Sequence, residues 1–230
     1  MRRDHLLALG EAYLVTFLWS PSYILVKIGL IQLSPLTLAA LRYLVASMML
    51  VPLAFMKEET HLLKGMNLFK VLFFGLSAYA IGQGLRYLGL FYLPAVSVSF
   101  ILNFTPVIVL VLEAIFLRER PTFIQLVGMA LAPLGAYSFF NTSLSVDNLT
   151  GILLTLLSGL GWAAYLVLSR FLFVKNKMST LELTGFSMDF GTLLIAASAY
   201  LTARPTIVSL SSWGIIIWLG VVNTAFTFLL

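Results

Sequence analysis

A few polar, charged and aromatic residues interrupt long apolar runs, and any chemistry of this chain rests on them. Hydrocarbon offers no hydrogen bonds, so a polar group in such a run needs a partner or a cavity. Trp19 and Trp162 each belong to a stripe of aromatic and hydroxyl side chains spaced three to four residues apart. We expect the stripes to face each other across a solute-binding cavity, although helix packing also explains them. The predicted substrate-binding residues are Trp19, Tyr23, Arg42, Tyr79, Gln83, Asn103, Trp162, Tyr165, Asp189 and Asn223.

Arg42 and Asp189 are the sharpest signals, because each lies near the middle of an apolar run. A charge at that depth costs at least about 2.5 kcal/mol, so each should face protein, water or a partner. Arg42 suits the anionic group of a solute, and Asp189 suits a change of protonation during transport. A structural ion pair or a hydrogen-bonded anchor accounts for either residue equally well.

Gln83, Asn103 and Asn223 place amide groups inside apolar runs, where they bind a polar solute or join two helices. Pro106 removes a backbone hydrogen bond and predicts a kink in its helix. Glu113 lies close to Arg118 in sequence, which predicts local charge compensation.

Catalytic and metal chemistry have little support in the sequence. There is no cysteine, which excludes disulfides and thiolate metal sites, and the two histidines, His5 and His61, lie beside charged segments. No paired acids, nucleophile–base pair or phosphate-binding Gly-Lys-Ser/Thr loop is present. We therefore predict that the chain is not an enzyme, holds no metal or cofactor and binds no nucleic acid.

The elements that position these residues are membrane-spanning helices. Hydrophobic types make up 60% of the 230 residues and charged types 10%, with a mean hydropathy of +1.02. A soluble fold of this length cannot bury that much apolar surface. The predicted class is an all-α polytopic membrane protein of about eight transmembrane helices, each long enough to cross a bilayer. The runs lie at about 9–29, 35–56, 69–89, 95–117, 122–140, 150–172, 181–202 and 212–230.

The cations predict an orientation. Ten of them fall on one side of the membrane: Arg2, Arg3, Lys57, Lys64, Lys70, Arg118, Arg120, Arg170, Lys175 and Lys177. Arg86 and Arg204 fall on the other side, so the positive-inside rule places the N-terminus in the cytoplasm. We expect a multi-pass protein of the cell membrane whose partners are the lipid bilayer and a small-molecule substrate. Homodimer formation is left open.

The chain also repeats itself. The pair Trp19 and Lys27 recurs as Trp162 and Arg170, and two further matches follow at offsets of 145 residues. We divide the chain into a first unit at 1–145, with five helices, and a partial second unit at 146–230, with three. Because five is odd, the second unit enters the membrane from the opposite face, as in the inverted repeats of secondary transporters.

The order of these features resembles the EamA family of the drug/metabolite transporter superfamily. It is carried by Trp19–Lys27, Pro35 with Arg42, Gly75 to Tyr79, Pro106 with Glu119-Arg120, and Trp162–Arg170. The resemblance implies ten helices in two inverted five-helix repeats, cytoplasmic termini and movement of small metabolites, often outward. The sequence departs from this pattern in lacking helices 9 and 10, which suggests a fragment or a short family member.

The leading functional hypothesis is secondary active transport of small metabolites or drug-like solutes, as a probable exporter, by alternating access around the Trp19 and Trp162 cavity. The alternative is a non-transporting membrane component, such as a lipid-carrier translocation subunit or a truncated inactive fragment.

Overall fold

The computed structural model describes residues 2–56, 66–143, 148–176, 180–202 and 208–229, and all regular structure in these ranges is helical. The predicted all-α class is confirmed. In chain order the elements are α1 (Arg2–Trp19), α2 (Ser22–Gly29), α3 (Pro35–Met56), α4 (Met66–Phe74), η1 (Gly75–Gly84), α5 (Leu85–Tyr92), α6 (Ala95–Leu102), α7 (Thr105–Leu112), η2 (Glu113–Leu117), α8 (Phe123–Ser143), α9 (Leu149–Asn176), α10 (Thr180–Thr202), α11 (Leu210–Ile217), η3 (Trp218–Phe226) and α12 (Thr227–Leu229). The η segments are π-helical.

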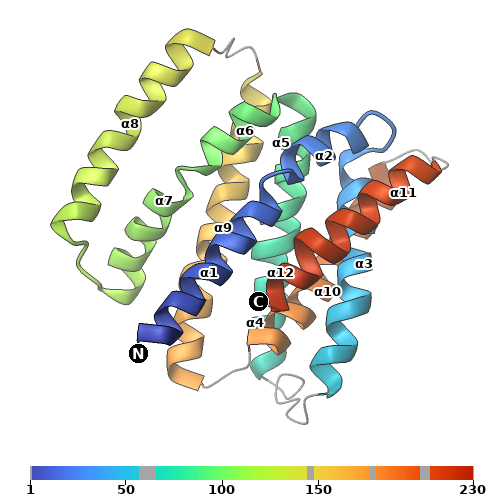
Figure 1. Ribbon diagram of the computed structural model, residues 1–230, viewed down its shortest axis with the longest axis horizontal. Helices are drawn as coiled ribbons and strands as arrows, with labels where there is room; N and C mark the ends of the chain where they lie inside the picture. The colour runs from blue at the N-terminus through green and yellow to red at the C-terminus, as the bar shows by residue number, and fades with distance from the viewer. Residues whose placement is uncertain (1, 57–65, 144–147, 177–179, 203–207, 230) are drawn as a thin grey trace.

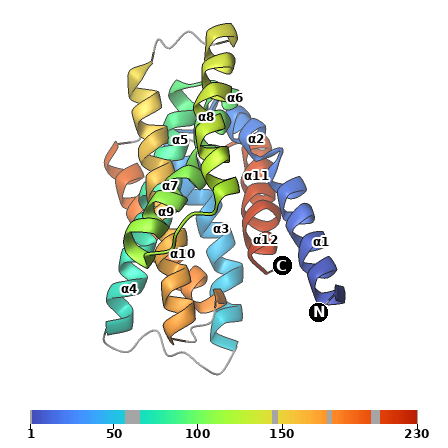
Figure 2. The ribbon, with the colours of Figure 1, turned by 90° about the vertical axis from the view of Figure 1, so that its left-hand side faces the viewer.

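These elements join into eight long segments that coincide with the eight predicted runs (Figures 1 and 2). Five of them are long and apolar enough to cross a membrane: Leu9–Gly29, Pro35–Leu53, Leu68–Tyr92, Ala95–Leu117 and Leu149–Arg170. Phe123–Gly135 and Leu210–Phe226 are shorter apolar helices. The segments run side by side in one bundle, with α8 at its edge.

Two of the spans are interrupted. The fourth span breaks between Leu102 and Thr105, just before Pro106, and the predicted kink is confirmed. The first span breaks between α1 and α2 at Pro21, an interruption that was not predicted. A proline has no backbone N–H to continue the hydrogen-bond ladder and clashes with the preceding turn, which accounts for both positions.

The centre of the bundle is the contact of α10 with α3 and η1. Glycines let these backbones approach closely, as is typical of helix packing in membranes. A Cβ on Gly191 would lie 2.3 Å from Cβ of Tyr79, and a Cβ on Gly75 would lie 2.6 Å from the Ser187 carbonyl oxygen. Tyr79 is consequently fully buried, and its position on η1 is fixed from the α10 side.

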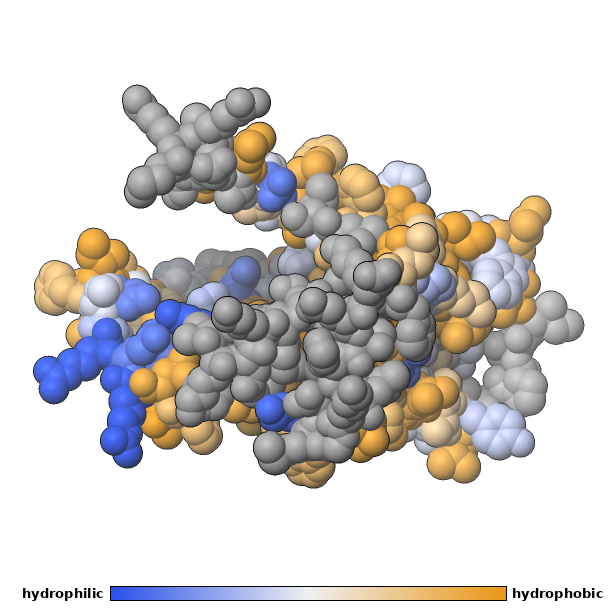
Figure 3. Space-filling model, turned by 90° about the horizontal axis from the view of Figure 1, so that it is seen from below, coloured by the Kyte–Doolittle hydropathy of each residue, from blue (hydrophilic) through white to orange (hydrophobic). Residues whose placement is uncertain are grey.

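Large apolar side chains cover much of the outer surface, as a bilayer requires. Ile124, Tyr200 and Leu210 are more than 80% exposed, and α8 is exposed along nearly all of its described surface. Figure 3 shows this apolar character from below, with hydrophilic surface gathered on the side where α7 and α8 are joined. The protein is a multi-pass membrane protein. Several predicted charges have side chains outside the described part: Arg2, Arg3, His5, Lys57, His61, Lys64, Lys175, Lys177 and Arg204.

Candidate functional site

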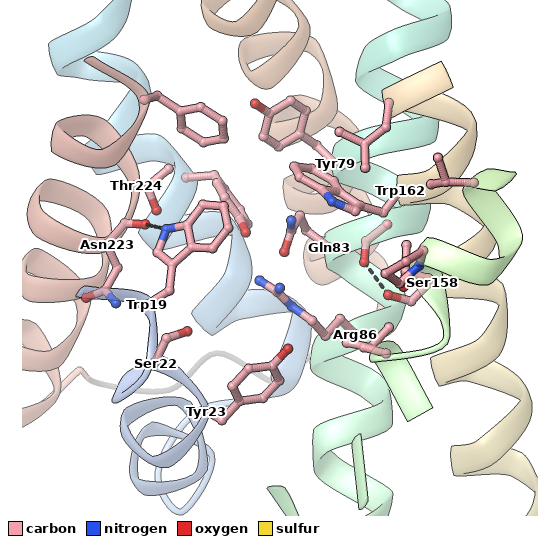
Figure 4. Close-up of a pocket in the computed structure, with 18 of the residues that line it drawn as sticks. Trp19, Ser22, Tyr23, Tyr79, Gln83, Arg86, Ser158, Trp162, Asn223 and Thr224 are labelled. Carbon is pink, nitrogen blue, oxygen red and sulfur yellow. Dashed lines mark hydrogen bonds between the residues drawn. The ribbon is translucent and has the colours of Figure 1, made fainter. Parts of the chain in front are cut away.

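A cavity of about 690 Å³ opens inside the bundle, between the first span and α9. Its volume falls in the range of about 300–1,000 Å³ that is typical of small-molecule sites. Seven of the ten predicted residues line it: Trp19, Tyr23, Arg42, Tyr79, Gln83, Trp162 and Asn223. Figure 4 shows Trp19 and Trp162 on opposite sides of this space. That these residues bind a substrate stays a prediction.

The other three predicted residues lie away from this cavity. Tyr165 packs its ring 5.7 Å from that of Phe74 and has its hydroxyl 3.5 Å from the Thr184 hydroxyl. Asp189 accepts a hydrogen bond from the Ser47 hydroxyl of α3. Asn103, at the break between α6 and α7, lines a second hollow of about 340 Å³. Helix periodicity predicts which face of a helix a residue lies on but not which helix packs against that face. The sequence alone therefore did not distinguish these three residues from the seven that line the cavity.

Trp19 is positioned by hydrogen bonds between the broken first span and the last one. Its Nε1 donates to the Asn223 carbonyl oxygen at 3.0 Å and to the Thr227 hydroxyl at 3.1 Å. The side-chain amide of Asn223 donates back to the Leu18 carbonyl oxygen at 2.6 Å. Because α1 ends at Trp19, its last carbonyl groups lack partners within the helix. Asn223 supplies one of those partners.

Trp162 is positioned by close backbone contact between α9 and η1. The Ser77 hydroxyl donates to the Gly161 carbonyl oxygen at 2.7 Å, and the Ser158 hydroxyl donates to the Gly82 carbonyl oxygen at 2.5 Å. A Cβ on Gly161 would lie 2.8 Å from the Ser77 carbonyl oxygen. The small residues on both helices therefore set the distance between them.

Arg42 is buried, with 4% of its surface exposed, and is held by neutral groups. Its Nε donates to the Thr224 hydroxyl and its Nη1 to the Tyr87 hydroxyl, each at 3.0 Å. The guanidinium also lies 5.3 Å from the centre of the Tyr43 ring. Among the described residues, no carboxylate forms a salt bridge with Arg42. The hydrogen-bonded anchor that was left open is thus observed, on a residue that also lines the cavity.

Arg86 lines the cavity too, which sequence reasoning missed. Its guanidinium lies 5.8 Å from the centre of the Tyr23 ring. The charge count had assigned Arg86 to the membrane surface because it lies near the end of its span. The overlooked signal was its spacing from Tyr79 and Gln83, which puts all three on one helix face.

The far end of the cavity carries an ion-pair cluster. Arg170 lies 2.6 Å from Glu113 and 3.2 Å from Glu119, joining α9 to the end of the fourth span. The predicted compensation of Glu113 by Arg118 is wrong. Arg118 has a left-handed backbone conformation with φ of 56° that ends the helix, and its side chain is exposed. Within the described ranges, no cluster of three or more His, Cys, Asp or Glu residues is arranged to hold a metal ion.

In the part of the chain that the structure describes, three buried polar atoms of cavity-lining residues have no hydrogen-bond partner: the Tyr79 hydroxyl, Gln83 Oε1 and Asn223 Oδ1. A buried polar group without a partner costs about 1–3 kcal/mol. Hydrogen bonding to a polar solute would offset that cost. The arrangement is suited to binding a small amphipathic molecule by aromatic walls and a few polar groups.

Comparison with known proteins adds a family and a fold. The model of the EamA-like transporter family matches residues 7–141 and 149–230. An uncharacterized transporter of Archaeoglobus fulgidus is 28% identical over 218 residues, which are 95% of this chain and 76% of that protein. A protein of Salmonella typhimurium named "Probable amino-acid metabolite efflux pump" is 33% identical over 168 residues, 70% of this chain and 52% of that protein's length. A solved crystal structure at 17% identity superposes with a TM-score of 0.72, covering 95% of this chain and 75% of the other.

Proposed function

This chain belongs to the EamA-like transporter family, and from that premise we propose that it exports small organic metabolites through the cavity between Trp19 and Trp162. The observation that carries the proposal is the cavity itself, about 690 Å³ in volume and lined from both predicted repeat units. Two interrupted spans border it, and interrupted helices are the usual setting of substrate sites in secondary transporters.

The proposed mechanism is alternating access. The two units rock about the cavity, which faces one side of the membrane and then the other, with a solute gradient or solute exchange as the energy source. We place the protein in the cell membrane with its N-terminus on the cytoplasmic side, which the distribution of positive charges favours. In this orientation the ion pairs of Arg170 with Glu113 and Glu119 lie at the cytoplasmic end of the cavity. There they hold α9 against the end of the fourth span.

The substrates we propose are amino-acid metabolites or solutes of similar size and polarity. Two curated relatives, from Salmonella typhimurium and Escherichia coli, carry the name "Probable amino-acid metabolite efflux pump". This chain covers 52% of the length of each. The lining offers both amide groups and aromatic rings to such molecules.

Solute counterflow with the full chain in proteoliposomes tests the proposal. Protein-containing vesicles that are loaded with an unlabelled amino acid should take up the same amino acid in labelled form from the medium. Their uptake should exceed that of protein-free vesicles loaded in the same way. Trp19→Ala or Trp162→Ala should lower the initial rate at least tenfold, because each removes a cavity wall. Trp218→Ala is the matched control, since that exposed tryptophan does not line the cavity. Equal rates with and without protein, for a folded sample, would reject transport of these solutes.

A coupling role for Asp189 is a separate proposal. Its carboxylate contacts the Ser47 hydroxyl at the packed α3–α10 contact. The proposed role is that this carboxylate gains and loses a proton during transport. Under that proposal, flux varies with pH in the native protein and loses that dependence in Asp189→Asn. An identical pH profile in the variant would remove Asp189 from the mechanism.

A further inference from the structure

The charged groups that line the cavity are unevenly distributed. They are Arg42, Arg86 and Glu113. Glu113 is paired with Arg170 at one end. The two arginines lie at the other end, where Arg42 is hydrogen-bonded to Tyr87 and Arg86 lies over Tyr23. In the described part of the chain, neither arginine has a carboxylate partner. This end of the cavity therefore carries unbalanced positive charge.

The two arginines differ in how they are held. Arg42 is buried, and its Nε and Nη1 donate hydrogen bonds to the hydroxyl groups of Thr224 and Tyr87. Arg86 is half-buried, and its guanidinium makes no hydrogen bond or ion pair to any described residue. Figure 4 shows its guanidinium extending into the space between Trp19 and Trp162. Arg42 supplies a fixed positive charge, whereas none of the five N–H donors of Arg86 is used by a described residue.

Gln83 lies one helical turn before Arg86 and is 7% exposed. Its side-chain amide makes no hydrogen bond to the described part of the protein, and its buried Oε1 has no partner. Figure 4 places the Gln83 amide and the Arg86 guanidinium in the same part of the cavity. An acid group of a solute placed between them would receive donors from both side chains.

We infer that Arg86 and Gln83 form an anion subsite that binds the carboxylate of an amphipathic solute. This inference rests on the proposed function and goes beyond it by naming the recognised group. Arg86 binds the carboxylate through a charge-assisted pair, the amide N–H of Gln83 donates a further bond, and Arg42 adds attraction without contact. The apolar part lies between Trp19 and Trp162. Because the charges without a carboxylate partner at this end are positive, a solute whose only charge is an ammonium is repelled.

Binding to the purified full chain in nanodiscs, measured by titration calorimetry, tests this with three probes of similar size. N-acetyl-L-leucine is an anion, L-leucine a zwitterion and L-leucinamide a cation. The anion should bind at least as tightly as the zwitterion, and the cation at least tenfold more weakly. Arg86→Gln should weaken anion binding about ten- to hundredfold and abolish the preference, as expected for loss of a charged hydrogen bond. Arg86→Lys should retain part of the binding.

Lys27→Gln is the matched control, because Lys27 is a partly buried cation of α2 that does not line the cavity. It should leave all three affinities unchanged. Equal anion affinity in Arg86→Gln and the native protein would overturn the inference, as would tightest binding of the cation. The two proposals fail in different measurements. If the protein binds these solutes but does not transport them, counterflow is absent while the charge preference in binding persists. Flux that is insensitive to solute charge and to Arg86 would reject the subsite alone.

Discussion

Trp162 is held at the cavity by a seam of glycines and serines, whereas Trp19 is held by hydrogen bonds across a broken helix. In the first seam, α9 and η1 meet so closely that a Cβ on Gly161 would lie 2.8 Å from a backbone oxygen. In the second seam, α1 and η3 are joined through Trp19 and Asn223. The described residues of α1 are mostly exposed, Tyr13 by 76% and Phe17 by 74%.

The contrast indicates which wall moves. Packing of small residues over several turns fixes two helices at one distance, because any displacement loses many contacts. A few hydrogen bonds near one end of a helix leave the rest of that helix free to tilt. We infer a fixed α9–η1 wall and an adjustable first span, and three substitutions probe the difference.

Gly161→Ala should have the largest effect on stability. Its Cβ would lie 2.7 Å from Ile81 Cγ2 and 2.8 Å from the Ser77 carbonyl oxygen. Overpacking of this kind lowers the free energy of unfolding by about 1–3 kcal/mol. The thermal midpoint in detergent, followed by circular dichroism, should fall. Gly128→Ala is the control, since nothing lies within 4 Å of its added Cβ. Equal midpoints for the two variants would contradict a fixed α9–η1 seam.

Asn223→Ala should have an intermediate effect, because it removes the donor to the Leu18 carbonyl oxygen. Loss of that bond should cost about 1 kcal/mol. The change should appear as faster amide hydrogen exchange in α1, with exchange in α9 unaltered. Asn103→Ala, at an exposed asparagine, should leave both unchanged. Faster exchange throughout the bundle would argue against an independently held first span.

Trp19→Phe should have the smallest effect on stability. It removes the indole N–H that is shared between Asn223 and Thr227 but keeps an aromatic wall. A hydrogen bond between membrane helices contributes about 0.6 kcal/mol on average. We expect a small decrease in the thermal midpoint and faster exchange in α1, with Trp213→Phe as the exposed control. A fall in midpoint as large as that of Gly161→Ala would show that both seams are equally rigid.

Hydropathy was sufficient to predict the number and approximate extent of the helical segments. Lipid selects for length and apolar character, and both can be counted along a chain. The break at Pro106 was also predictable, because proline acts through its own backbone. The break at Pro21 has the same cause and the same signal, so it too can be predicted from the sequence.

Partner identity was not predictable. Glu113 pairs with Arg170, 57 residues away, rather than with nearby Arg118. Asp189 bonds to Ser47, 142 residues away. Such pairs depend on how two helices are rotated and shifted against each other, which the spacing within either helix does not specify. Arg86 was missed for a related reason, since a cation near a span end extends to the surface or turns inward according to its neighbours.

The break in the first span also sets an order of assembly. Trp19 bonds to Thr227, 208 residues later in the chain. At a synthesis rate of about 5–20 residues per second, about 10–40 s separate these two residues at the ribosome. During that interval the Leu18 carbonyl oxygen lacks its donor, the Asn223 amide, and the Trp19 indole N–H lacks its acceptors on Asn223 and Thr227. The end of α1 is therefore synthesised well before the residues that hold it, and nascent chains halted before η3 should cross-link through α1 to lipid or insertion machinery.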